Sequence, residues 1–168
     1  MRASFSELLA RFNRERERFV EGLVHPVLIW EPRGSGGLRV WESTAAGPVH
    51  TPVGGAFETT VFEVVKSGRN TLEQGITLGR TEHNDLTLVD DSVSRLHAIF
   101  LADAAGWTIT DALSKNGTWV DGERLVPNRL YRLQDGAKLK VGKAELEFQL
   151  GSTFAARFAA LLPKPRVA

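Results

Sequence analysis

Cysteine is absent from this 168-residue sequence. Its absence excludes disulfide frameworks, Cys-rich zinc sites and thiol nucleophiles, and it fits a reducing compartment. An excess of one charge sign is absent too, because 21 Lys and Arg residues stand against 20 Asp and Glu. A net charge of +1 provides no field that would hold a polyanion, so we expect no nucleic-acid partner.

Long uncharged apolar runs are also missing. Residues 1–19 carry charges where a secretory signal needs an unbroken apolar stretch, and no later segment is long and apolar enough for a transmembrane helix. We therefore expect a cytoplasmic protein that does not bind membranes. With 42% hydrophobic and 24% charged residues, the composition is that of a globular chain with one core.

Sequence signatures of catalysis are not found. The histidines lie in unrelated contexts, and neither a Gly-x-Ser-x-Gly elbow nor an HExxH helix occurs. No pair of carboxylates is marked as a general acid and base. We expect no enzyme activity, no cofactor and no metal site.

The N-terminal region has the pattern of an amphipathic helix. Ser4 and Glu7 have the spacing of a capping box, and apolar residues then recur every three or four positions as far as Leu23. This spacing predicts a single helix over about residues 5–22. The charged run at residues 14–18 mixes signs, as a solvated helix face does.

A second, short helix is predicted near the C-terminus. Ser152 or Thr153 would cap its N-terminus, and Pro163 would end it. Because an isolated amphipathic helix is marginal in water, we expect both helices to pack on each other or on the rest of the fold, away from the candidate site. The apolar residues on one face of the C-terminal helix are Phe154, Phe158, Leu161 and Leu162.

Between the two helices the sequence has the pattern of short strands. Residues 27–30 and 38–41 are short runs rich in β-branched or aromatic residues around a Gly-rich turn, and residues 43–57 predict a linker or long surface loop. Regular short strands without a helical period predict an all-β, antiparallel sandwich or barrel. The later strands are expected at 60–65, 76–78, 86–89, 97–102, 107–111, 118–120, 131–133, 137–141 and 144–150.

Three clusters of polar and cationic residues fall at the ends of predicted strands, where a rigid sandwich displays recognition groups. They are Gly79-Arg80, Ser94-Arg95-Leu96-His97 and Ser114-Lys115-Asn116-Gly117-Thr118. Each cluster alone has an ordinary structural explanation; Asn-Gly, for example, is a common hairpin turn. Their order and spacing together carry the functional information.

In this order the clusters resemble the forkhead-associated (FHA) domain family. The matching stretches are ITLGRTEHNDLTLVDDSVSRLHAIF, WTITDALSKNGTWVDGERL and LQDGAKLKVGKAELEF. The resemblance implies an antiparallel β-sandwich of the SMAD/FHA-like type whose loops read phosphothreonine in extended partner segments. The expected organisation is an N-terminal helix at 1–25, short strands and a linker at 26–57, the FHA domain at 58–150, and a short helix and tail at 151–168.

The resemblance also implies which residues bind a phosphopeptide. A phosphothreonine carries about 1.5 to 2 negative charges and three acceptor oxygens, so its receptor needs cations and hydrogen-bond donors. Arg80 would be the main phosphate contact, with Ser94 donating its hydroxyl and Arg95 contributing from the same loop. Ser114 and Lys115 would touch the phosphate or the residues beside it.

Further residues are expected to position the peptide or the loops. By the resemblance, Asn116 bonds the main chain of the peptide and sets its register, a role suited to an amide. Gly79 and Gly117 would serve backbone geometry. His97 would tie the loops together, as a structural residue and not a catalytic one. The acidic pair at residues 90–91 lies close enough to influence the pocket, in a direction that the sequence does not determine.

Threonines of the chain itself are candidate phosphorylation sites. The segment around Thr59 and Thr60 resembles one that precedes the domain in some bacterial members, where the domain binds its own phosphorylated tail. Here that segment runs straight into a predicted strand without the linker that folding back requires, so ordinary strand structure is the preferred interpretation. Thr51, followed by proline, is another candidate.

The function implied by the resemblance is a phosphothreonine-dependent protein–protein interaction module, a signalling adaptor that reads the products of Ser/Thr kinases. Its partner would be a phosphothreonine-containing protein, either a Ser/Thr kinase or a kinase substrate. The alternative is a phosphate-independent scaffold or assembly subunit whose flanking helices dock a larger complex, because a fold alone does not determine function.

Overall fold

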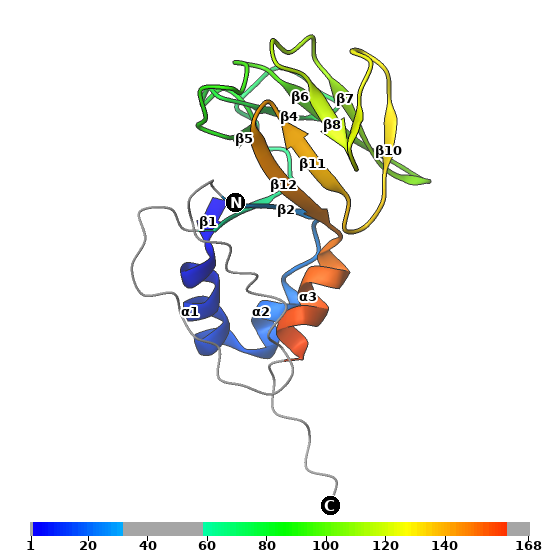
Figure 1. The fold of residues 1–168 in the computed structure, drawn as a ribbon. Coiled ribbons are helices and arrows are strands. Elements are labelled where there is room, and N and C mark those ends of the chain that lie inside the picture. Colours follow the sequence, from blue (N-terminus) through cyan, green and yellow to red (C-terminus); the bar gives the residue numbers. More distant parts are fainter. Residues whose placement is uncertain (1, 32–58, 161–168) are drawn as a thin grey trace, which may run out of the picture.

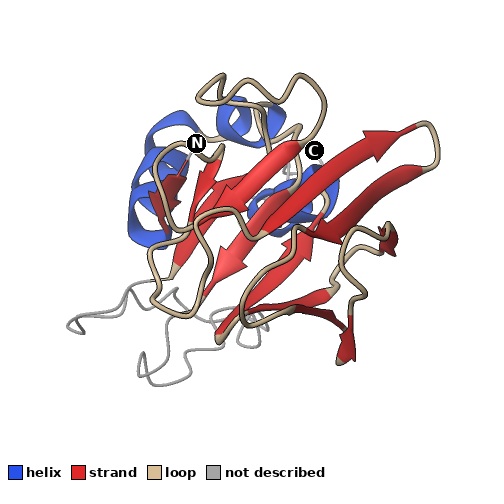
Figure 2. Ribbon diagram, turned by 90° about the horizontal axis from the view of Figure 1, so that it is seen from above, coloured by secondary structure: helices blue, strands red, loops and turns tan. Residues whose placement is uncertain are grey.

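The computed structural model describes residues 2–31 and 59–160. Two β-sheets pack face to face, and three helices lie together at one end of the molecule (Figures 1 and 2). Within the described ranges, no helix has the length and apolar character needed to cross a membrane.

The larger sheet has seven strands and is antiparallel throughout. The smaller sheet has five strands, of which only the β4–β5 pair is parallel. The expected antiparallel β-sandwich is therefore confirmed, with one parallel pair at its edge. In spatial order the larger sheet contains β1 (Arg2–Ser4), β3 (Thr60–Glu63), β2 (Val27–Trp30), β12 (Ala144–Gln149), β11 (Lys138–Val141), β8 (Thr118–Val120) and β9 (Glu123–Arg124). The smaller contains β10 (Tyr131–Leu133), β7 (Gly106–Asp111), β6 (Ala98–Asp103), β4 (Ile76–Gly79) and β5 (Leu86–Thr87).

The main core lies between the two sheets. Phe148 of β12 is opposite Leu28 of β2, which is opposite Phe62 of β3, so these side chains form one row on the inner face. Phe100 and Ile109 meet them from the smaller sheet, and all five are buried. Along each strand such buried residues alternate with residues that point outward. The packed inner faces form a rigid body from which the loops project.

The predicted strands between residues 60 and 150 are all present. β2, β8 and β10 match their predicted bounds, and the others differ from theirs by one or two residues. The strand at 38–41 and the linker at 43–57 fall outside the described residues. β1 and β9 were not predicted. The start of the domain at residue 58 stays a prediction. β1 and β2 precede that residue, yet both pair with β3 in the larger sheet.

The prediction of one N-terminal helix is wrong. The capping box is present, since Ser4 Oγ accepts from the Glu7 N–H (3.2 Å) and the Glu7 carboxylate accepts from the Ser4 N–H (2.7 Å). However, the helix α1 (Phe5–Glu15) ends at Arg16, whose φ is 51°, and a second helix, α2 (Glu17–Glu21), follows. No glycine or proline marks this break, so its cause must lie in tertiary packing.

That packing involves three phenylalanines. The Phe12 and Phe19 rings lie 5.3 and 4.9 Å from the Phe158 ring of α3 (Gly151–Ala159), measured between centroids. The bend at Arg16 brings α1 and α2 around α3, and all three rings are buried. Burial of aromatic surface therefore offsets the cost of the positive φ at Arg16.

The predicted cap of α3 is also wrong. Its N-cap is Leu150, and neither Ser152 nor Thr153 caps it with a side chain. Instead, the carboxylate of Asp135, from a turn distant in sequence, accepts from the Leu150 N–H (2.7 Å) and from the Thr153 hydroxyl (2.5 Å). An acidic group at a helix N-terminus is favourable. Leu161 to Pro163 lie outside the described residues.

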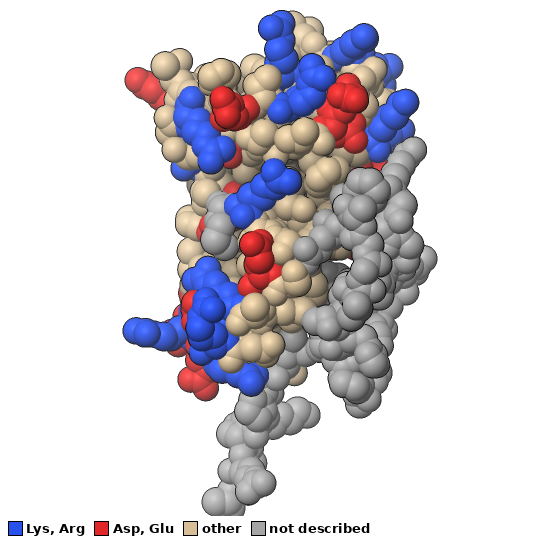
Figure 3. All heavy atoms as spheres, turned by 90° about the vertical axis from the view of Figure 1, so that its left-hand side faces the viewer, with Lys and Arg blue, Asp and Glu red and all other residues tan. Residues whose placement is uncertain are grey.

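The three helices cover part of the outer face of the larger sheet. Their apolar side chains form a second core with Val27, Ile29 and Val61, which point away from the first core. The predicted packing of the helices on each other and on the sandwich is confirmed, and they lie away from the loops of the smaller sheet (Figure 1). On the exposed helix face basic and acidic side chains are mixed (Figure 3), as expected of a solvated surface.

Candidate functional site

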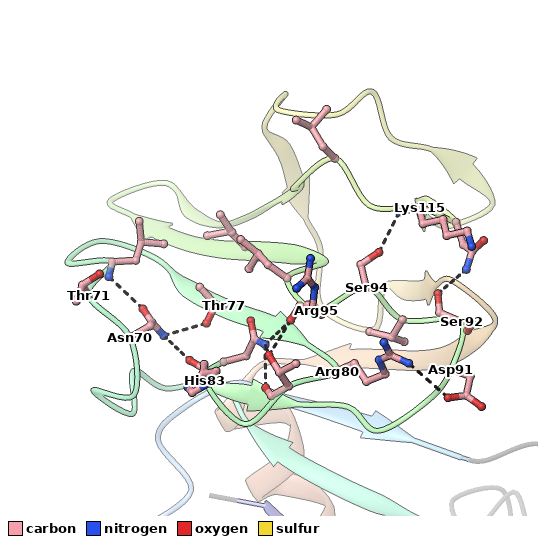
Figure 4. A pocket seen from close by; sticks show the side chains of 18 residues that line it. Asn70, Thr71, Thr77, Arg80, His83, Asp91, Ser92, Ser94, Arg95 and Lys115 are labelled. Atoms are coloured by element: carbon pink, nitrogen blue, oxygen red, sulfur yellow. Dashed lines mark hydrogen bonds and ion pairs between the residues drawn. The ribbon is translucent and has the colours of Figure 1, made fainter.

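A groove of about 1080 Å³ lies where the loops at one end of the smaller sheet meet (Figure 4). Three loops line it. The first loop (residues 80–85) connects β4 to β5, the second loop (88–97) connects β5 to β6, and the third loop (112–117) connects β7 to β8. Of the predicted contact residues, the groove is lined by Arg80, Ser94, Arg95, Lys115 and Asn116.

The first and second loops are tied together by close backbone contact. Gly79 permits it, because a Cβ atom there would lie 2.2 Å from the carbonyl oxygen of Arg95. The Arg80 N–H donates to the Ser94 carbonyl (2.9 Å), and Asn84 Nδ2 donates to the Arg95 carbonyl (2.6 Å). Arg80 and Ser94 are therefore held in a defined relation before any ligand binds.

His97 joins the second loop to the third. Its Nδ1 accepts from the Ser94 N–H (2.9 Å), so the ring proton resides on Nε2, which donates to the Gly117 carbonyl (3.0 Å). The ring is fully buried, and this burial lowers the pKa of His97. The neutral imidazole thus acts as a bridge between the loops.

The contact predicted for Ser114 stays a prediction, but its hydroxyl is already engaged within the third loop. Ser114 does not line the groove, because its hydroxyl donates to the buried carboxylate of Asp111 (2.6 Å) and accepts from the Gly117 N–H (2.9 Å). Burial acts to raise the pKa of Asp111, but hydrogen bonds from Ser114 and Thr118 bring this pKa below its usual value. Ser114 therefore shapes the third loop. Asp111 was not predicted, although an aspartate at the end of an apolar strand could have suggested it.

Ser94 is placed to donate a hydrogen bond into the groove. Its Oγ accepts from the Lys115 N–H (2.9 Å), which leaves the hydroxyl hydrogen for another acceptor. Figure 4 shows Arg80, Ser94 and Lys115, one from each loop, at the same end of the groove. These three residues bring two cations and one hydroxyl together.

Asn116 is oriented by a residue that the sequence analysis did not assign to the site. Its Nδ2 donates to the Ser92 carbonyl (2.7 Å), and no described residue bonds its Oδ1. Ser92 is held in turn, because its hydroxyl donates to Asp90 (2.5 Å) and accepts from the Lys143 N–H (2.8 Å). An aspartate two residues before a serine is a turn signal that could have identified this support.

Within the described part of the chain, the Arg80 side chain has only one, weak, charged partner. Its Nη1 lies 3.5 Å from Asp91 Oδ1, and the Asp91 side chain is fully exposed. Among the described residues, Arg95 and Lys115 make no ion pair within 4.0 Å. An exposed pair at this distance contributes little, so an incoming anion would meet little competition for Arg80.

At its other end the groove is lined by Asn70, Thr71 and His83 (Figure 4). Asn70 Nδ2 donates to the buried carboxylate of Asp85 (3.0 Å), which also accepts from the Thr77 N–H (2.9 Å). Burial acts to raise the pKa of Asp85, but its hydrogen bonds, first from Thr77 and then from Asn70, hold this pKa far below its usual range. This wall was not predicted from the sequence.

Of the candidate phosphorylation sites, Thr59 and Thr60 are poorly placed for a kinase. Thr60 is buried in β3, between Ser4 of β1 and Trp30 of β2, and the Thr59 carbonyl accepts from the Phe5 N–H (2.9 Å). A kinase would have to unpair β3 to reach them. Thr51 lies outside the described residues.

Comparison with known proteins gives similarities over this same region. The FHA domain family model matches residues 76–142. The chain is 36% identical over 103 residues to the E3 ubiquitin-protein ligase rnf8-A of Xenopus laevis, covering 51% of this chain but only 19% of the ligase. It is 33% identical over 115 residues to the oxoglutarate dehydrogenase inhibitor of Corynebacterium glutamicum, covering 65% of this chain and 78% of the inhibitor.

Among solved structures, Mycobacterium tuberculosis EmbR in complex with a low affinity phosphopeptide is similar at 32% sequence identity. That similarity covers 46% of this chain and 20% of EmbR, with a TM-score of 0.41.

Proposed function

The chain belongs to the FHA domain family, and we propose that it is a phosphothreonine-dependent protein–protein interaction module, a cytoplasmic adaptor that reads the products of Ser/Thr kinases. Modules of this family recognise phosphorylated motifs through arginine-containing sites. The partner is a phosphothreonine-containing protein, a kinase or its substrate. The module binds this partner and leaves catalysis to other proteins. We assign recognition to residues 58–150, with the helices and the strands before residue 58 as support.

The observation that carries this proposal is the convergence of Arg80, Ser94 and Lys115, from three different loops, on one end of a groove. A phosphate group needs cations and hydroxyl donors without a strong competing carboxylate. Asp91 is the nearby acid, and its contact with Arg80 is long and exposed. The loops are already fixed by Gly79 and His97, so binding costs little ordering of the receptor.

Asn116 supplies the second half of the recognition. With one amide hydrogen used on Ser92, its Oδ1 and second N–H are left to bond the main chain of a peptide. Such contacts are independent of the peptide's side chains, so Asn116 sets the register of the peptide while the phosphate supplies the specificity.

The scaffold alternative loses one of its supports. It relied on flanking helices that dock onto a larger complex, but the apolar faces of these helices are buried against Val27, Ile29 and Val61 of the chain's own sheet. Over the described residues, the apolar stripe that would serve as a docking surface is thus already covered.

Calorimetry with one peptide in three forms tests the proposal. We expect micromolar affinity for the phosphothreonine form, about fivefold weaker binding for phosphoserine because one methyl group is worth roughly 1 kcal/mol, and no measurable binding for the unphosphorylated form. Equal affinity for phosphorylated and unphosphorylated peptide would favour the scaffold alternative.

Ser94→Ala and Ser114→Ala form a matched pair within this experiment. Ser94→Ala should weaken phosphopeptide binding while its melting temperature stays close to wild type. Ser114→Ala should lower the melting temperature, because it removes a donor to the buried Asp111 carboxylate. The opposite pattern would mean that the two serines have been assigned the wrong roles.

A further inference from the structure

A cationic surface lies behind the third loop, on the outer face of the larger sheet. Trp119 of β8 is opposite Lys140 of β11 on one side and Arg124 of β9 on the other, so these three side chains share one face. Lys140 Nζ lies 4.5 Å and Arg124 Cζ 5.4 Å from the centroid of the indole ring. We call these three residues the basic ledge. The indole holds both cations in place by cation–π attraction.

The basic ledge adjoins the groove through Gly117. A Cβ atom at Gly117 would lie 2.9 Å from Arg124 Nε and 3.2 Å from Trp119 Cη2. The preceding residue, Asn116, lines the groove. The ledge therefore begins one residue beyond Asn116, at the groove wall.

The charges of the basic ledge are available to a partner. Across the described residues, neither Arg124 nor Lys140 has a carboxylate within 4.0 Å, whereas Lys138 of the same strand is paired with Glu147 (2.5 Å). Glu145 lies opposite Lys140 on the side away from Trp119. Among the described residues, the two cations of the basic ledge are thus oriented by an aromatic ring and not neutralised by an ion pair.

We propose that the basic ledge binds acidic residues that flank the phosphothreonine in the same partner segment. This inference rests on the proposed function of the groove. An extended chain advances about 3.3 Å per residue, so a segment anchored at Asn116 reaches the ledge within a few residues. Cations already held against an indole lose little side-chain freedom when they bind a carboxylate. The favoured partners are therefore phosphothreonine sites within acidic sequence.

Three phosphothreonine peptides with the same central residues test this inference. One carries two glutamates on its N-terminal side, one carries them on its C-terminal side, and one has glutamine at all four positions. We expect wild-type protein to bind one of the acidic peptides about fivefold more tightly than the glutamine peptide, the gain expected from two partly exposed ion pairs. The gain should shrink at high salt.

The double variant Arg124→Gln/Lys140→Gln should lose this gain and still bind the glutamine peptide as wild type does. The matched control is Arg18→Gln on α2, an exposed cation on the helices, which should keep the gain. The inference is overturned if neither acidic peptide is preferred or if the double variant retains the preference. Failure of all three phosphopeptides to bind wild-type protein would instead refute the proposed function of the groove. Circular dichroism checks that the double variant folds. If it does not fold, the single variants Arg124→Gln and Lys140→Gln are measured in its place.

Discussion

Asp85 and Asp91 both lie beside the groove and both face a cation, yet the protein holds them very differently. The Asp85 carboxylate is buried and accepts hydrogen bonds from the Ser67 N–H (2.8 Å), the Thr77 N–H (2.9 Å) and Lys66 Nζ (3.0 Å). Asp91 is fully exposed, and its interaction with Arg80 spans 3.5 Å. The first carboxylate is part of the framework, and the second leaves its cation nearly free.

This difference separates structural cations from binding cations. A buried carboxylate with its donors in place cannot be removed without leaving those donors unpaired, so its partner Lys66 belongs to the fold. An exposed pair has little net energy, so Arg80 can exchange Asp91 for a ligand that carries more charge. Of the two cations, Lys66 and Arg80, Arg80 is therefore the one that a phosphate would bind.

The largest expected effect comes from breaking the buried arrangement. Asp85→Ala leaves the Thr77 and Ser67 N–H groups without their acceptor, and it should lower the free energy of unfolding by about 3–5 kcal/mol. Urea denaturation measures this loss. Asp91→Ala is the control and should unfold at the wild-type urea concentration. Equal losses in the two variants would show that burial does not distinguish the two carboxylates.

Arg80→Ala should weaken phosphopeptide binding by roughly 2 to 5 kcal/mol, because the phosphate would lose its main cation in a partly desolvated groove. Folding should be unaffected, as circular dichroism would verify. Arg80→Lys should recover only part of the affinity, since an ammonium group lacks the planar two-pronged contact of a guanidinium. A folded Arg80→Ala variant that binds as tightly as wild type would overturn the site assignment in favour of a scaffold.

A smaller effect should appear in mildly acidic solution. The pKa of His97 is lowered in the folded state by burial, so the stability linked to its neutral form is fully present above the unfolded pKa of about 6.5 and is lost as the pH falls below that value. Urea denaturation between pH 7.5 and 5.5 should show this decline. In His97→Gln, which is less stable at every pH, the decline should be weaker. A wild-type slope that persists in this variant would assign it to another group.

The smallest effect is expected at Asp91. Asp91→Asn removes the competitor of Arg80, so phosphopeptide affinity should rise about twofold at low salt while stability is unchanged. Calorimetry at two salt concentrations measures both parts of this expectation. Weaker binding in Asp91→Asn would mean that Asp91 positions Arg80 for the ligand.

Strands and loop positions were predictable because their signals are local. β8 and β10 begin and end where the sequence analysis placed them, since turn residues with special backbone preferences bound each short apolar run. Arg80, Ser94 and Asn116 were found as members of motifs at strand ends, and the groove brings them together.

The errors arose where a distant residue decides the outcome. The helix break at Arg16 depends on Phe158, and the cap of α3 comes from Asp135. The bond of the Ser114 hydroxyl to Asp111 was likewise not foreseen. In both hydrogen bonds, an aspartate accepts from a group that only the folded chain brings close to it. No pattern in the sequence around Arg16 or Leu150 distinguishes the observed structure from the predicted one.

The amino-acid sequence by itself determined the all-β class, the family and the residue types available for binding a phosphate, because periodicity, turn chemistry and motif spacing act over a few residues. The tertiary structure alone decided which of those residues face the groove. Packing of two sheets places three loops side by side, turns Ser94 toward the groove and Ser114 away from it, and leaves Arg80 with an exposed partner while Asp85 is buried. The physical reason is that burial and hydrogen-bond partnership are properties of the assembled sandwich, fixed only when segments distant in sequence exclude water from between them.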